Sequence, residues 1–333
     1  MYRKFYGLDR KPFELAPIGG LVYLSEAHRE GVAILRYGVI ADKGFLLLTG
    51  GVGAGKTTIL NTLLNMLQSH VKTCVLNNPK LSRNEFYYFL GAKLGIRCNG
   101  NKSQFILKFS DLLEKLEAGK NKLLLIIDEA QAFSIDLLEE IRLLSNHAEG
   151  RNVFSIFLIG QPELQEKLAT PQLLPLRQRI GVRYHLDSLT RDETAQYIFY
   201  RLNAAGAVRT SIFDDDAVDA IHEASRGTPR LINIICDHAM IQGFTREAFR
   251  IDRLNIVECL KAIRLQGEER LNISLLPEQA EDTVKPLWQR GEFRWAAIIG
   301  AFTLVFAAVT AAASSFAGQQ YFRFLQEWLV SLY

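Results

Sequence analysis

Cysteine is scarce in this sequence, and the few cysteines present are widely separated. The 333 residues contain four, Cys74, Cys98, Cys236 and Cys259, with no C-x-x-C pair among them and no histidine at ligand spacing. This pattern gives no support for a structural zinc site or a disulfide framework. We expect buried thiols in a reducing compartment.

An excess of charge of one sign is also lacking. The chain has 39 Lys and Arg against 36 Asp and Glu, a net charge of +3, so composition alone does not indicate a nucleic-acid-binding protein. Residues 1–6 lack the apolar run of a secretory signal, and no internal repeat or low-complexity tract occurs. The 48% of apolar residues is enough for one large or two moderate folded domains.

A glycine-rich loop is the most informative feature that is present. It follows the apolar run 45–48, precedes the apolar run 59–64, and consists of Gly50, Gly51, Val52, Gly53, Ala54, Gly55, Lys56, Thr57 and Thr58. This is the Walker A spacing, in which backbone N–H groups hold phosphates, Lys56 neutralises their charge and Thr57 holds Mg²⁺. The alternative is a chance glycine-rich turn. The loop predicts binding of ATP or GTP.

Two adjacent carboxylates end another apolar run, Leu123 to Ile127. Asp128 and Glu129 form a Walker B pattern, in which Asp128 would anchor Mg²⁺ and Glu129 would polarise the water that attacks the γ-phosphate. The alternative is that both acids only cap the following helix. Because adjacent carboxylates at the end of a buried strand are costly without a cation, the pair indicates hydrolysis.

Apolar runs alternate with helical patterns in the first half of the chain. We expect strands near 45–48, 73–76, 123–127 and 153–159, and helices near 27–40, 86–94, 103–117 and 135–144. Strands that are apolar throughout and separated by helices predict an α/β fold with a parallel sheet covered on both faces.

The second half of the chain is expected to be helical. Helical patterns cover 192–204, 214–224, 229–242 and 253–266, with Thr190 and Asp192 as candidate N-caps and Pro229 in a first turn. The expected organisation is a nucleotide-binding α/β domain with a leader at 1–190, a small helical lid at 191–267 and a linker at 268–294.

A long uncharged segment follows the linker. Residues 295–317 carry no charge over 23 positions, and as a helix they would span about 34 Å, enough for a bilayer core. Lys285, Arg290 and Arg294 precede the segment and only Arg323 follows it, which predicts a cytoplasmic N-terminal body on a single-pass protein of the bacterial inner membrane. A buried alanine-rich helix is the alternative. Residues 318–333 would form a short amphipathic tail.

Several sequence blocks together resemble the AAA+ ATPases of the ExeA/GspA type, found with bacterial type II secretion and related envelope systems. The blocks are 5–13, 23–28, 128–131, 160–164, 176–180 and 227–233. The resemblance implies an ATPase that uses ATP and Mg²⁺, assembles as a ring of six or seven copies, and drives assembly, remodelling or export with envelope-complex proteins in secretion, pilus or exopolysaccharide systems. In that family a periplasmic peptidoglycan-binding domain typically follows the span; only residues 318–333 follow it here.

The resemblance also implies roles for residues outside the two Walker motifs. Gln161 is similar to a sensor-1 amide near the γ-phosphate, and Arg230 to the sensor-2 arginine of the lid. Arg179 is the candidate arginine finger supplied in trans, with Arg177 and Arg183 as alternatives. The expected catalytic set is Glu129, Lys56, Gln161, Arg179 and Arg230.

Three leader residues and two asparagines complete the expected site. Tyr23, Leu24 and His28 lie where the resemblance places the adenine pocket, although such residues often only pack in a core. Asn77 or Asn78 could restrain the catalytic glutamate, or could be loop amides.

A second class of function stays open at the sequence level. Related AAA+ proteins of the transposition-regulator type share this leader and these motifs, so a nucleotide switch or DNA-engaged regulator is the alternative. The predicted membrane span argues against contact with nucleic acid without excluding it.

Overall fold

The computed structural model of the chain describes residues 2–14, 22–41, 43–77, 81–99, 101–148 and 151–265. All of them belong to one compact unit, Met1–Leu276. Within these ranges no helix is long and apolar enough to cross a membrane. The expected linker at 268–294, span at 295–317 and tail at 318–333 lie outside the described residues.

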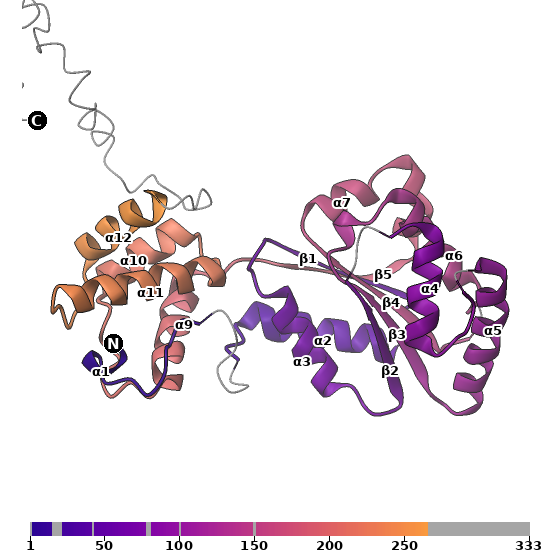
Figure 1. Cartoon of the computed structure of the whole chain (residues 1–333), viewed down its shortest axis with the longest axis horizontal. Coiled ribbons are helices and arrows are strands. Elements are labelled where there is room, and N and C mark those ends of the chain that lie inside the picture. The colour runs from indigo at the N-terminus through magenta and orange to yellow at the C-terminus, as the bar shows by residue number, and fades with distance from the viewer. Residues whose placement is uncertain are drawn as a thin grey trace, which may run out of the picture. The chain divides into compact units, whose positions relative to one another are not determined.

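A five-stranded parallel sheet, in the order β2-β3-β4-β1-β5, forms the centre of the α/β part (Figure 1). Its strands are β1 (Phe45–Gly50), β2 (Val71–Leu76), β3 (Lys122–Ile127), β4 (Phe154–Gly160) and β5 (Ile180–Leu186). Because all strands are parallel, the carboxyl ends of β1, β3 and β4 meet at one edge of the sheet, where ligands bind in open α/β folds. The predicted parallel sheet is confirmed.

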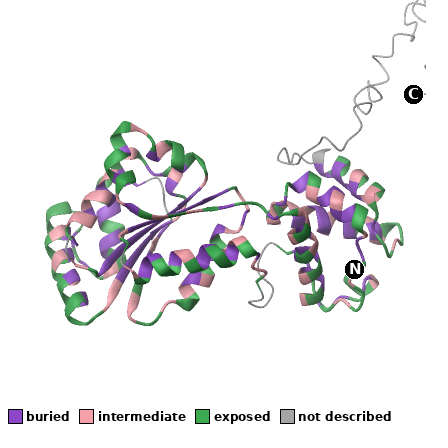
Figure 2. Cartoon of the chain, turned by 180° about the vertical axis from the view of Figure 1, so that it is seen from behind, coloured by how far each residue is buried: buried purple, intermediate pink, exposed green. Residues whose placement is uncertain are grey.

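Helices cover both faces of this sheet, because alternate side chains of each strand point to opposite faces. The helices are α2 (Glu26–Ile40), α3 (Lys56–Met66), α4 (Arg83–Leu94), α5 (Lys102–Ala118), α6 (Ile135–Asn146), α7 (Glu163–Leu168) and α8 (Leu174–Gln178). Leu46 and Leu48 pack in one core cluster with α2 and α3, whereas Phe45 and Leu47 pack in another with α4, α5 and α6. Figure 2 shows the resulting buried strands between helices that are exposed on their outer sides.

Strand β5 was not expected from the sequence. Its burial alternates along the strand, with Ile180 and Leu186 buried but Arg183 and His185 exposed, as on an edge strand. This segment therefore lacks the continuous apolar run that predicted the other strands. Pairing with β1 alone leaves its other edge outside the ladder.

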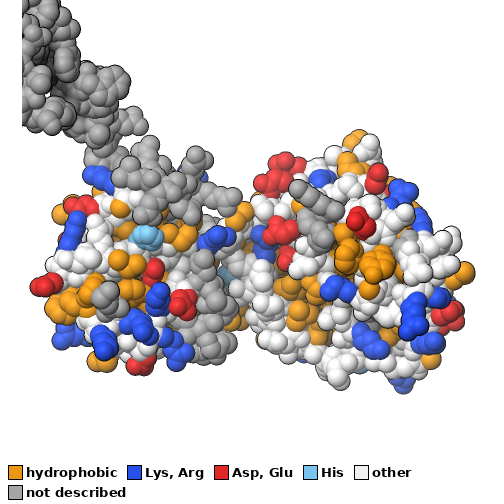
Figure 3. Space-filling view, viewed as in Figure 1, with side chains coloured by type: hydrophobic (Ala, Val, Ile, Leu, Met, Phe, Trp, Pro, Cys, Tyr) orange, Lys and Arg blue, Asp and Glu red, His pale blue; other side chains and the backbone are white. Residues whose placement is uncertain are grey.

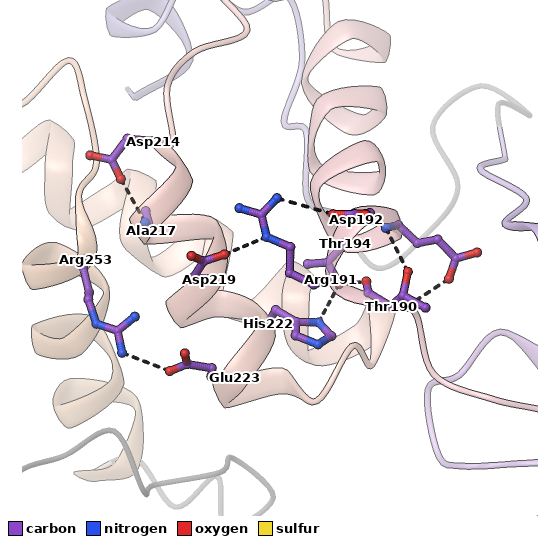
Figure 4. Close-up of polar contacts among 11 residues, drawn as sticks. Thr190, Arg191, Asp192, Thr194, Asp214, Ala217, Asp219, His222, Glu223 and Arg253 are labelled. Carbon is purple, nitrogen blue, oxygen red and sulfur yellow. Dashed lines mark hydrogen bonds and ion pairs between the residues drawn. The ribbon is translucent and has the colours of Figure 1, made fainter.

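The segment expected to be a lid, which we call the lid, consists of four helices, α9 (Arg191–Ala204), α10 (Asp215–Ser225), α11 (Pro229–Thr245) and α12 (Arg253–Leu265), around a core separate from those of the sheet. Thr190 caps α9 in a capping box with Glu193, which confirms the predicted helix start. Polar contacts join the helices at their surface (Figure 4): Arg191 Nε lies 2.6 Å from Asp219, Thr194 Oγ1 lies 3.0 Å from His222, and Arg253 lies 3.0 Å from Glu223.

The leader contacts both parts of the described chain. Its first helix, α1 (Tyr2–Phe5), and residues up to Phe13 pack in the core of the lid, where the Tyr2 hydroxyl donates to Asp237 at 2.5 Å. Its second helix, α2, packs on the sheet and is capped by Ser25. The first part of the leader therefore contacts the lid, and its second part, α2, contacts the sheet.

A buried carboxylate connects three helices on one face of the sheet. Glu140 of α6 is 3% exposed and accepts hydrogen bonds from the Tyr87 hydroxyl at 2.5 Å and from Lys102 at 2.7 Å, with Arg83 at 3.0 Å. Burial acts to raise the pKa of Glu140, but hydrogen bonds from Lys102 and Tyr87 and the charge of Arg83 outweigh it, so the net pKa is lowered.

This pKa direction gives a pH-dependent stability prediction. Glu140→Gln removes the negative charge that interacts with Tyr87, Lys102 and Arg83. This substitution should lower the free energy of unfolding at pH 7 by about 2 kcal/mol. Since the folded-state pKa is lowered, the contribution is present above the unfolded-state pKa and lost as pH falls through the folded-state value. Urea unfolding should therefore show the deficit shrinking below about pH 4.

The neighbouring residue supplies the control for this measurement. Glu139 is only half-buried and pairs with Arg142 on the same helix, so Glu139→Gln should cost less than about 1 kcal/mol. Equal losses for the two variants, or a Glu140→Gln deficit independent of pH, would contradict the assignment of the buried charge network.

Candidate functional site

The glycine loop lies at the carboxyl end of β1, as the sequence predicted. The strand ends at Gly50, and α3 begins at Lys56 after Gly53 and Gly55, which adopt φ of 78° and 114°. A Cβ at Gly55 would lie 2.3 Å from Nε2 of His28, and one at Gly53 would lie 2.6 Å from Cβ of Arg230. Both positions therefore require glycine for backbone conformation and for space.

Lys56 is buried beside this loop. Its ammonium donates to the carbonyls of Gly50 and Gly51, both at 2.9 Å. Burial lowers the pKa of Lys56, while the charges of Glu129 and Asp128 act in the opposite direction. The cation is thus held at the N-terminus of α3, where backbone N–H groups and the helix dipole favour a bound anion.

The Walker B carboxylates follow β3 at the same edge of the sheet. Asp128 is half-buried and accepts the N–H of Glu129 at 2.9 Å. Burial raises the pKa of Asp128, and the negative charge of Glu129 raises it further. The hydrogen bond from the Glu129 backbone N–H acts to lower the same pKa. Glu129 itself is exposed and has φ of 52°, a left-handed conformation that is uncommon for a residue other than glycine.

Two glutamines hold the Glu129 carboxylate. Gln131 Nε2 donates to Glu129 Oε2 at 2.5 Å, and Gln161 Nε2 donates to the same oxygen at 3.2 Å. The two are also joined to each other, because Gln161 N donates to Gln131 Oε1 at 3.1 Å. A Cβ at Gly160 would lie 2.7 Å from that oxygen, so Gly160 leaves room for the link.

Gln131 had no expected role, although it ends the 128–131 block on which the resemblance depends. The expected restraint of Glu129 was placed instead on Asn77 or Asn78. Asn77 is exposed and makes no hydrogen bond to Glu129 among the residues that the structure describes, and Asn78 lies outside them. In the described chain the amides that contact Glu129 are those of Gln131 and Gln161.

One cavity of about 450 Å³ is lined by Lys56, Glu129 and Gln161, whereas Asp128 and Gln131 are not among its lining residues. Its lining comes from the leader, the glycine loop, the ends of β3 and β4, and the lid: Val22, Tyr23, His28, Val52, Gly53, Gly55, Lys56, Thr57, Thr58, Glu129, Gln161, Leu189, Tyr197, Arg201, Pro229, Arg230 and Asn233. The volume is in the range of small-molecule sites. The structure therefore brings the expected Tyr23, Lys56, Gln161 and Arg230 to one place.

The leader touches the lid and the loop beside this cavity. The Tyr23 hydroxyl donates to Gln196 at 3.1 Å, and its ring packs edge-on against Tyr197 with centroids 5.6 Å apart. His28 is 3% exposed, with Nδ1 2.8 Å from Ser25 Oγ, and burial lowers the pKa of its ring. Burial therefore favours the neutral form of His28, which packs against Gly55.

The lid supplies three cavity residues that the sequence did not reveal. Arg201 donates to the Tyr197 hydroxyl at 3.1 Å, and this hydroxyl donates to Asn233 at 2.9 Å. Arg201 also donates to the Pro12 carbonyl at 2.6 Å, which ties the leader to the lid. Tyr197 and Arg201 are four residues apart on α9, a spacing that places them on one helix face but does not identify a ligand site.

The candidate arginine fingers differ in their surroundings. Arg179 is half-buried and donates to Ser145 Oγ at 2.6 Å. Arg177 and Arg183 are exposed, and Arg183 donates to the Arg177 carbonyl at 2.7 Å. Within the described chain, all three lie outside the lining of the 450 Å³ cavity.

The donors near the loop suit a hard cation. Thr57 offers a hydroxyl in the first turn of α3, and Asp128 offers a carboxylate beside Lys56. No group of three or more His, Cys, Asp or Glu able to bind a metal occurs in the described ranges. Mg²⁺ is usually held by one or two protein oxygens together with substrate phosphates, so the residues present fit this ion.

Comparisons with known proteins agree with the fold. Residues 40–168 match the model of an AAA domain. The chain is 40% identical over 255 residues to general secretion pathway protein A of Aeromonas hydrophila, a match that covers 75% of this chain and 46% of that protein. The chain thus spans about half the length of this relative.

Two more distant proteins are also similar, one in sequence and one in fold. The chain is 24% identical over 249 residues to RuvB, a Holliday junction branch migration complex subunit of Fervidobacterium nodosum, covering 74% of this chain and 64% of RuvB. Cdc6p of Pyrobaculum aerophilum superimposes with a TM-score of 0.58 at 16% identity, covering 76% of this chain and 70% of that one. The resemblance inferred from the motifs is confirmed: this chain carries an AAA domain and is similar over three quarters of its length to general secretion pathway protein A.

Proposed function

We propose that this chain is a membrane-anchored ATPase that hydrolyses ATP with Mg²⁺ and drives assembly, remodelling or export in a bacterial envelope system. The central observation is that Lys56 and Glu129 line one cavity, together with residues of the glycine loop and the lid. The amides of Gln131 and Gln161 donate hydrogen bonds to the Glu129 carboxylate. The 40% identity to general secretion pathway protein A supports the envelope assignment.

We assign a distinct task to each group of the site. The loop N–H groups and Lys56 would hold the phosphates, and Thr57 and Asp128 would hold Mg²⁺, which supplies charge neutralisation. Glu129 would accept a hydrogen bond from the attacking water and orient it toward the γ-phosphorus, so that the bond to the leaving ADP oxygen breaks. Gln161 would keep Glu129 oriented, and Arg230 would connect the phosphates to the lid.

A ring of six or seven copies forms part of the proposal. Arg179 of a neighbouring copy would approach the γ-phosphate once released from Ser145, with the more exposed Arg177 and Arg183 as alternatives. The inner-membrane location depends on the uncharged segment 295–317 and the preceding basic residues of the sequence.

The role of Glu129 gives the first test. Glu129→Gln keeps the size of the side chain but removes its ability to accept a proton or polarise water. ATP turnover should fall by about a hundredfold or more, while affinity for a fluorescent ATP analogue stays within about threefold. Phosphate release and a fluorescence titration measure the two quantities. Glu166→Gln, at an exposed acid on α7, should leave both near the parental values.

The outcome separates the proposal from its alternative. A Glu129→Gln variant that hydrolyses ATP at the parental rate would disprove the catalytic assignment. If the parental rate rises with added DNA in a salt-dependent way and does not respond to lipid vesicles, the DNA-engaged regulator is favoured over the envelope ATPase.

Gln131 gives an independent prediction, because it contacts the catalytic carboxylate without lining the cavity. Gln131→Leu removes its hydrogen bonds to Glu129 and to the Gln161 backbone. We expect kcat to fall by about tenfold with the nucleotide Kd changed by less than about twofold, since orientation and not phosphate binding is lost.

A matched glutamine controls for hydrophobic substitution. Gln104 is exposed on α5, and Gln104→Leu should leave kcat unchanged. Weaker nucleotide binding by Gln131→Leu with an unchanged kcat would show that Gln131 supports the loop and not Glu129.

A further inference from the structure

The lid carries a second hollow, separate from the nucleotide cavity. It is a groove of about 830 Å³ formed by α1, the segment between α9 and α10, and the turn between α11 and α12. We call it the lid groove; its lining residues are Lys4, Phe5, Tyr6, Gly7, Val208, Arg209, Ser211, Ile212, Phe249 and Arg250.

Apolar side chains at the lid groove are unusually open to solvent. Val208 is 88% exposed and Phe249 is 59% exposed. The Phe249 ring stacks on Phe5, with centroids 4.2 Å apart and planes at 12°. Single exposed apolar residues are common on protein surfaces, so these two support a binding surface only together with the charges that lie beside them.

The cations of the lid groove differ from two arginines elsewhere in the lid, Arg191 and Arg253. Lys4, Arg209 and Arg250 are exposed, and in the described part of the chain their side chains have no hydrogen bond or ion pair. No carboxylate is among the residues that line the groove. Arg191 and Arg253, by contrast, each lie against a carboxylate of the lid.

Figure 3 shows the same combination on the surface. Lys or Arg side chains and hydrophobic side chains gather at the end of the lid where α1 lies. Three unpaired cations beside exposed apolar groups are complementary to a ligand with negative charge and an apolar side chain.

We propose that the lid groove docks a short acidic segment of a partner protein. An apolar side chain of that segment packs on Phe249 and Val208, and its carboxylates pair with Lys4, Arg209 and Arg250. The bounded groove favours a peptide over nucleic acid, because three cations would meet few of the phosphates that sustain DNA binding. The proposal does not depend on ATP hydrolysis.

Fluorescence anisotropy with the full-length chain tests this proposal. The probes are short labelled peptides rich in Glu around a central Phe, Leu or Trp, and matched peptides with Lys in place of Glu. The acidic peptides should bind about tenfold or more tightly than the basic ones, and their affinity should fall with added salt. Equal affinity for both sets, or no binding of either, would overturn the proposal.

Charge-reversal variants locate the binding. Arg209→Glu combined with Arg250→Glu should weaken the acidic peptides by about tenfold or more, and Val208→Ser should weaken them without changing the salt dependence. Lys115→Glu, a single charge reversal at an exposed position of α5, should have less than about a twofold effect. Circular dichroism and thermal melting confirm that the variants fold.

A labelled single-stranded oligonucleotide provides the competing outcome. If it binds more tightly than every acidic peptide and loses affinity in the Arg209→Glu and Arg250→Glu variant, the groove is a nucleic-acid surface and the proposal fails. Unchanged peptide binding by that folded double variant would also exclude the lid groove.

Discussion

The contact of the glycine loop with two other parts of the chain constrains the candidate site. Gly53 and Gly55 have no room for side chains, because Arg230 of the lid and His28 of the leader lie against them. The loop is therefore enclosed by segments that are distant in the sequence. A substitution that rotates α11 or shifts the start of α2 would therefore change the space available over the glycine loop.

Charge balance within the cavity follows from this packing. Lys56 is buried, and the nearby carboxylates of Glu129, Asp128 and Glu163 oppose the lowering of its pKa. Glu129 is in turn held by the linked amides of Gln131 and Gln161. A neutral amide can fix the direction of a carboxylate without neutralising it, which is the requirement for a residue that polarises water.

The sequence predicted the parts of this arrangement that depend on local patterns. The strands apolar on both faces, the glycine loop and the Asp128–Glu129 pair are readable because burial and phosphate binding need particular residues at fixed spacing. Strand β5 was not predicted, because buried and exposed residues alternate along an edge strand. The roles of Gln131, Tyr197 and Asn233 were not predicted, because their contacts join segments that are distant in the sequence. The position of α1 in the lid core likewise depends on tertiary packing that no local pattern encodes.

We propose that the leader, the glycine loop and the lid together form one nucleotide site. Hydrogen–deuterium exchange with and without ATP and Mg²⁺, on the Glu129→Gln variant to prevent turnover, tests it most directly. We predict slower exchange in the three segments 22–28, 50–58 and 227–233. The amides of the glycine loop would bind the phosphates, and the segments 22–28 and 227–233 would close over them. Protection of 50–58 with unchanged exchange in both 22–28 and 227–233 would contradict it.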